Sequence, residues 1–158
     1  MLTKIKELLE KIENSEDFKE FKQKQPESYL SSIFISDEIQ FHYYNPSTNK
    51  ISTFSEEKSS TDLEIFKKPE AKIKPLDLEN IKISFEEIEK TIAKKLQEKA
   101  TKKIIILQTL DSKTIYNITI ITTTFNVFNL KLDATTGEII HESLTPVFEF
   151  KESPKPSS

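Results

Sequence analysis

The sequence predicts an α+β protein built from two tandem units, each a helix followed by an antiparallel sheet. An amphipathic helix with a strong start signal is predicted from Ser84 to about Lys99, and alternating segments typical of strands follow it. Residues 129–140 read as strand, tight turn and strand, and the turn holds Gly137, the only glycine. A similar order of helix and strands occupies residues 1–55, before a segment rich in Ser, Lys, Glu and Pro.

Composition excludes several classes of protein. All 23 basic residues are lysines, and they are mixed with 26 acidic residues for a net charge of −3, so no surface for nucleic acid is expected. The absence of cysteine excludes disulfides and thiolate chemistry. No run approaches the roughly 18 apolar residues of a membrane span. The charged, amphipathic N-terminus predicts a cytoplasmic protein, or an extracytoplasmic one if a leader was removed.

The first unit, residues 1–55, begins with two predicted helices. Residues 2–13 carry apolar side chains at helical spacing. Ser15 can cap a second short helix whose apolar face holds Phe18 and Phe21, and Pro26 ends the helical region.

Three strands follow in the first unit, at residues 29–35, 38–44 and 50–54. Alternation places Phe41 and Tyr43 on one face of the second strand and Tyr44 on the other. Packing within the protein is the favoured role for these rings. The alternative is that one of these rings is exposed and binds a partner. Phe41, Tyr43 and Tyr44 are therefore the candidate partner-binding residues.

Residues 56–82 are expected to be a charged, proline-containing linker. Within it, residues 62–66 fit one helical turn or a short strand, and the alternation of residues 76–83 fits an edge strand.

The second unit, residues 83–150, begins at Ser84, which can form a capping box with Glu87. Strands are predicted at residues 103–110, 114–124, 125–132 and 138–144. Asp133 is expected to start the last turn and Gly137 to close it with a positive φ.

The chain after the last turn carries two further signals. Pro146 indicates an edge strand or a bulge. Residues 151–158 are expected to be a disordered tail.

Residues 83–142 resemble the PepSY domain family. The resemblance rests on the capped helix from Ser84 to Leu96 and on the ending Leu-Lys-Leu-Asp-Ala-Thr-Thr-Gly-Glu-Ile-Ile of residues 130–140. It implies PepSY-like or cystatin-like units, with an antiparallel sheet packed on one helix. It also implies regulation of a peptidase, and no catalytic residue. Residues 44–51 echo residues 132–139, so a degenerate second copy is predicted in residues 1–55.

No constellation for catalysis appears in the sequence. The two histidines, His42 and His141, lack a neighbour at metal-ligand spacing, and a single glycine leaves no phosphate-binding loop. We therefore expect no catalytic residue, no cofactor and no metal site.

The sequence therefore predicts a non-enzymatic module that binds a protein or peptide through a sheet edge or an exposed sheet face. One alternative is an enzyme or small-ligand carrier with a cavity between sheet and helix. Another is a self-associating structural subunit, a homodimer, with residues 122–124 and 104–107 as its pairing edge.

Overall fold

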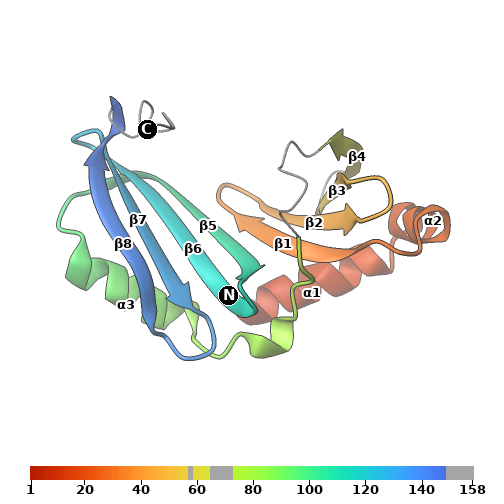
Figure 1. Cartoon of the computed structure of the whole chain (residues 1–158), viewed down its shortest axis with the longest axis horizontal. Helices are drawn as coiled ribbons and strands as arrows, with labels where there is room; N and C mark the ends of the chain where they lie inside the picture. Colours follow the sequence, from red (N-terminus) through yellow and green to blue (C-terminus); the bar gives the residue numbers. More distant parts are fainter. Residues whose placement is uncertain (57–58, 65–72, 149–158) are drawn as a thin grey trace.

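A computed structural model describes residues 1–56, 59–64 and 73–148, and it confirms the α+β class. The described strands form one eight-stranded antiparallel sheet in the order β4-β3-β2-β1-β5-β6-β7-β8. The helices lie against one face of this strongly curved sheet (Figure 1). The bounds of the elements are α1 Leu2–Glu13, α2 Glu16–Lys24, β1 Tyr29–Ile35, β2 Ile39–Asn45, β3 Lys50–Ser55, β4 Ser59–Glu64, the 3-10 helix η1 Leu78–Asn80, α3 Phe85–Lys95, β5 Ala100–Leu110, β6 Lys113–Thr122, β7 Asn126–Asp133 and β8 Ile139–Pro146.

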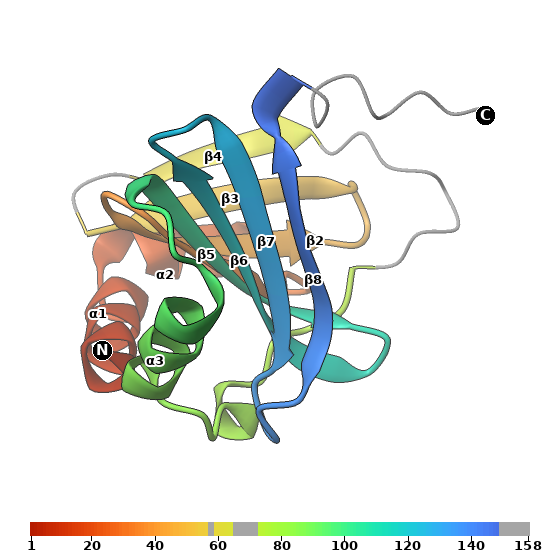
Figure 2. The same ribbon diagram turned by 90° about the vertical axis from the view of Figure 1, so that its left-hand side faces the viewer.

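The two halves of the chain meet at the pairing of β1 with β5, which makes one continuous sheet. Ile33 lies opposite Leu107 there, and both side chains are fully buried. From this junction each half runs outward as a simple up-and-down order of four strands, as Figure 2 shows for β5 to β8. Residues 104–107, expected as a pairing edge, are therefore central, because β5 has β1 on one side and β6 on the other.

The core lies between the sheet and the helices. In the first half, four aromatic rings pack with centroids 5.0 to 5.8 Å apart. They are Phe18, Phe21, Tyr43 and Phe54. In the second half, Phe85 of α3 packs edge-on against Tyr116, whose hydroxyl donates to the Ile83 carbonyl at 2.8 Å. Burial raises the pKa of the Tyr43 and Tyr116 hydroxyls, so both remain neutral donors.

The start of α3 confirms the predicted capping box. The Ser84 hydroxyl accepts from the Glu87 amide at 3.1 Å, and the Glu87 carboxylate accepts from the Ser84 amide at 3.0 Å. Two amides that a helix start leaves without partners are thereby satisfied.

The segment expected as a linker contributes to the sheet and to the core. Its residues 59–64 form β4, which pairs with β3. The edge strand expected at residues 76–83 is wrong: η1 stands there, and Leu76 and Ile81 are buried on either side of it. The amides of Lys82 and Ile83 both donate to the Ala134 carbonyl, so this segment is tied to the β7–β8 turn.

That turn confirms the roles predicted for Asp133 and Gly137. The Asp133 carboxylate accepts from the Thr135 and Thr136 amides at 2.8 and 3.2 Å. Gly137 has φ +84°, and its amide donates to the Asp133 carbonyl. A Cβ at Gly137 would lie 3.3 Å from Ile83, so the turn needs glycine for its conformation and has little room for a side chain.

The two turns with similar sequences do not connect equivalent strands in the two halves. Residues 46–49 connect the second and third strands after the helices, whereas residues 134–138 connect the third and fourth. The order of elements is the same in both halves, and a tandem repeat stays a prediction.

Candidate functional site

The sheet ends at β8, and among the described residues no strand pairs with its outer edge. Figures 1 and 2 show it as the outermost strand on that side. Most of its side chains are exposed, in contrast to those of β5, β6 and β7. The edge character that Pro146 indicated is confirmed.

The register of β7 and β8 decides which backbone groups of β8 point outward. The Val147 amide donates to the Phe125 carbonyl at 2.8 Å, in line with the ladder that pairs Asn126 with Pro146. Along an antiparallel pair, every second residue directs its amide and carbonyl toward the neighbouring strand. The backbone groups of the odd-numbered residues 141 to 147 therefore point toward β7. The amide and carbonyl groups of Glu142 and Leu144 therefore point to the open side, together with the carbonyl of Pro146.

Two features limit the length of this open edge. At one end, the register shifts between Lys131 and Leu132, which leaves Ile140 in a bulge. At the other end, Pro146 has no amide hydrogen to donate outward. An incoming strand would find full donor and acceptor pairs at Glu142 and Leu144.

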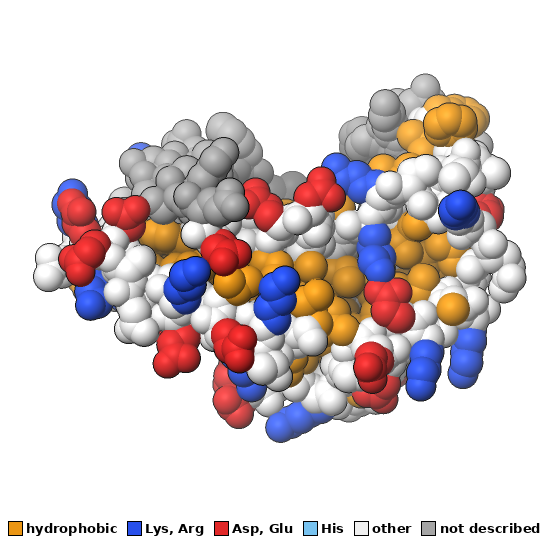
Figure 3. Space-filling view, turned by 180° about the vertical axis from the view of Figure 1, so that it is seen from behind, with side chains coloured by type: hydrophobic (Ala, Val, Ile, Leu, Met, Phe, Trp, Pro, Cys, Tyr) orange, Lys and Arg blue, Asp and Glu red, His pale blue; other side chains and the backbone are white. Residues whose placement is uncertain are grey.

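Large apolar side chains surround the open edge. Leu144 is 49% exposed, Ile140 45%, and Phe148, just beyond the strand, 62%. Figure 3, seen from behind, shows a protruding apolar cluster at its upper right. This corner corresponds to the upper left of Figure 1, where the C-terminal end of β8 lies. Phe125, in the β6–β7 turn, is 73% exposed and has φ 62°, a strained conformation for a bulky residue.

Polar contacts fix the sheet next to these apolar residues. Glu142 forms an ion pair with Lys95 of α3 at 3.1 Å. The Glu98 carboxylate accepts hydrogen bonds from Thr124 and Asn126, and these bonds, the one from Thr124 first, hold the pKa of Glu98 below its usual range. The β6–β7 turn that carries Phe125 is thereby held to the segment after α3.

The aromatic residues predicted to bind a partner separate as the alternation required. Phe41 and Tyr43 are buried on the helix side of β2, where neither ring reaches the surface. Tyr44 lies on the opposite face, half-buried, packs edge-on against Tyr29 and donates to Asn49 at 2.8 Å. Tyr44 is the one member of this set with surface access, and a partner role for it stays a prediction.

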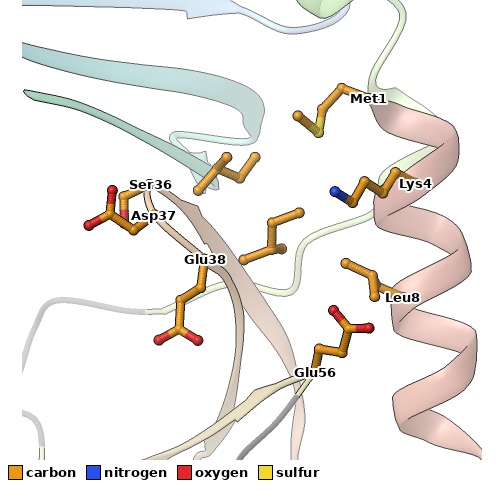
Figure 4. A pocket seen from close by; sticks show the side chains of 9 residues that line it. Met1, Lys4, Leu8, Ser36, Asp37, Glu38 and Glu56 are labelled. Atoms are coloured by element: carbon orange, nitrogen blue, oxygen red, sulfur yellow. The ribbon is translucent and has the colours of Figure 1, made fainter.

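A cavity of about 450 Å³ lies between the first half of α1 and the β1–β2 turn. Figure 4 shows Met1, Lys4 and Leu8 of the α1 segment facing Asp37 and Glu38 across it. Ile35 and Ile39 line its inner part. The charged groups around it are all exposed, so the cavity offers no buried acid or base for chemistry.

A smaller cavity of about 210 Å³ lies on the face of the sheet opposite the helices. His42 lines it, stacked on Phe34 with ring centroids 4.4 Å apart, together with Gln108. Burial lowers the pKa of the His42 imidazole, which favours the neutral ring near pH 7.

The other histidine, His141, is exposed on β8. Among the described residues, no three His, Asp or Glu side chains come together as metal ligands would.

Residues 82–142 match the family model "Peptidase propeptide and YPEB domain", the PepSY domain. The resemblance read from the sequence is confirmed for this segment, which spans α3 to β8.

A solved structure of a "putative lipoprotein" from Clostridium difficile 630 has a similar fold, with a TM-score of 0.52 and 15% sequence identity. The match covers 81% of this chain and 90% of that chain, so it includes both halves of the sheet. Comparison with curated proteins gives no match. No helix in the described part of the chain is long and apolar enough to cross a membrane.

Sequence reasoning missed Leu144 and Ile140 as candidate contact residues. The signal that was available is Pro146, which marked the edge, followed by the exposed apolar positions on its N-terminal side.

Proposed function

We propose that this protein is a non-enzymatic module that binds an extended segment of a partner protein alongside β8. The observation that carries the proposal is the outward-pointing backbone of Glu142 and Leu144, flanked by exposed apolar side chains. Backbone pairing gives such an interaction its affinity, and side-chain contacts on alternate residues give it selectivity.

The side chains beside the edge favour a partner segment with apolar residues on the helix side. Leu144 and Glu142 lie opposite Phe128 and Leu130 of β7, which point into the core, so they project on the same side as α3. A partner residue next to Leu144 would cover apolar surface. A residue next to Glu142 would meet the carboxylate that Lys95 already neutralises in part.

The PepSY match supports a partner of the peptidase type, because the family model describes peptidase propeptides. We propose that this chain regulates a peptidase by holding one of its extended segments. The similar fold of a protein described as a lipoprotein supports an extracytoplasmic location.

Synthetic decapeptides with alternating apolar and polar residues provide a direct probe of pairing at β8. From an array of such peptides, the best binder is made in two N-methylated forms, each blocking the amides along one of its two edges. We expect one form to lose binding and the other to retain it, because only one edge of the peptide faces β8.

The matched protein variants are Leu144→Pro, which removes an outward amide, and Leu144→Ala, which shortens the same exposed side chain but keeps that amide. Leu144→Pro should abolish peptide binding while the thermal unfolding temperature stays close to that of the parent. Equal binding by both N-methylated peptides, or by Leu144→Pro and the parent, would contradict strand pairing at this edge.

A further inference from the structure

We propose that, in the free protein, the open edge of β8 pairs with β8 of a second copy, antiparallel, about a two-fold axis at Leu144. This inference rests on the same open edge as the proposed function, and it names the partner that occupies the edge when no peptide is bound.

Exposed apolar residues lie on both sides of Leu144, namely Ile140 in the bulge of β8 and Phe148 beyond the end of the strand. Ile140 lies four residues before Leu144, and Phe148 lies four residues after it. All three side chains are 45% to 62% exposed. In an antiparallel pair centred on Leu144, the two Leu144 side chains meet at the axis, so each covers exposed apolar surface of the other.

The backbone is self-complementary in the same register. Each Leu144 amide can donate to the Leu144 carbonyl of the second copy, because both groups point outward. Each Glu142 amide can donate to the Pro146 carbonyl of the second copy. Pro146 has no amide hydrogen, but it acts only as an acceptor in these hydrogen bonds, so they can form without one.

Other registers are less favourable on charge and burial. A two-fold axis at Glu142 would place two carboxylates opposite each other, which destabilises a strand pair. An axis at Ser143 would place Leu144 opposite a carboxylate. The axis at Leu144 places Glu142 opposite uncharged Pro146 and, on the other face of the sheet, Ser143 opposite Thr145.

Disulfide trapping can read the register directly, because the chain has no cysteine. Directly opposed residues in a hydrogen-bonded antiparallel pair have Cα atoms about 5.5 Å apart, a separation that a disulfide spans. Leu144→Cys should therefore cross-link under mild oxidation at least about tenfold faster than Leu110→Cys, an exposed position far from the proposed axis, because pairing raises the effective thiol concentration.

Ser143→Cys tests the neighbouring register. It should cross-link no faster than Leu110→Cys if the axis lies at Leu144. Fastest cross-linking at Ser143 would overturn the proposed register, and equal rates at all three positions would overturn self-pairing.

Light scattering across a concentration series tests the pairing without oxidation. The parent protein should be a dimer that dissociates on dilution, Leu144→Lys should be monomeric, and Leu110→Lys should remain a dimer. Circular dichroism of both variants verifies that they fold. A parent protein that is monomeric at all concentrations would overturn self-pairing.

The peptide experiment separates this outcome from the proposed function. A monomeric parent that still distinguishes the two N-methylated peptides refutes the dimer alone. A Leu144-centred dimer that no peptide of the array displaces refutes strand capture alone.

Discussion

Leu107→Ala at the β1–β5 junction should destabilise the whole protein, not only one half of it. Leu107 is fully buried and lies opposite Ile33, which is also fully buried. The two side chains join the hydrophobic core of the first half to that of the second. A cavity at this position therefore removes packing from both.

The expected loss of unfolding free energy is about 3 to 4 kcal/mol, in the range for a fully buried leucine replaced by alanine. For a chain of this size, each kcal/mol shifts the midpoint by roughly 2 to 4 °C, so the midpoint should fall by roughly 6 to 16 °C. Leu110→Ala is the matched control, because this leucine of the same strand is 40% exposed. Its effect should stay within about 0.5 kcal/mol.

Scanning calorimetry is the suitable assay, because the chain has no tryptophan and an optical probe would report unevenly on the two halves. The parent protein should show one heat-absorption peak, and Leu107→Ala should move that peak as a whole. Two separate peaks, with only one of them shifted by Leu107→Ala, would refute the coupling of the halves through the junction.

Three further predictions concern the turn, the cap and the buried histidine. Gly137→Ala should cost about 1 to 2 kcal/mol in urea unfolding, because φ +84° is strained for alanine, and Gly137→Asn should cost less; equal costs would contradict the conformational explanation. Ser84→Ala should lower the free energy of unfolding by about 1 kcal/mol, because it removes the α3 cap. Glu86→Ala, in the same first turn but outside the capping box, should change it little. Burial lowers the pKa of His42 in the folded protein, so the unfolded chain takes up its proton first and stability falls as pH drops below about 6.5. His42→Gln should remove this part of the pH dependence, and an unchanged difference between pH 7.5 and pH 5.5 in thermal unfolding would contradict the assignment.

The helices and most strands were predictable because their signals are local. The capping box at Ser84, the alternation of β2 and the Asp133–Gly137 turn each depend on neighbouring residues alone. For the segment of β4, the sequence predicted only one helical turn or a short strand at residues 62–66. Ser59–Glu64 is mostly polar and lacks alternation, as a short edge strand often does.

The pairing of β1 with β5 was not predictable from local patterns, since about half the chain separates them. The run Ile104 to Leu107 is a candidate pairing edge by composition, but a continuous apolar run is also typical of a strand covered on both faces. In the structure, β5 has a strand on each side, and Ile104 and Ile106 are half-buried whereas Ile105 and Leu107 are buried. Interpreting the apolar run as a strand covered on both faces would have placed β5 at the centre of the sheet.

The candidate site was predictable only in part. Pro146 identified an edge, and alternation correctly separated Tyr44 from Phe41 and Tyr43. The outward direction of the Leu144 backbone depends on the register between β7 and β8, which the bulge at Ile140 shifts by one residue. A one-residue change in register exchanges inward and outward groups, so sequence alone could not assign them.

An open sheet edge is a hazard for aggregation, and β8 limits that hazard without removing it. Pro146 and the bulge at Ile140 confine full backbone pairing to Glu142 and Leu144. A contact this short is too weak to close the edge permanently, so it suits reversible pairing, either with a second copy or with a partner segment. Because both use the same backbone groups, each must exclude the other, and the concentration of the free protein sets how much of the edge a partner finds open.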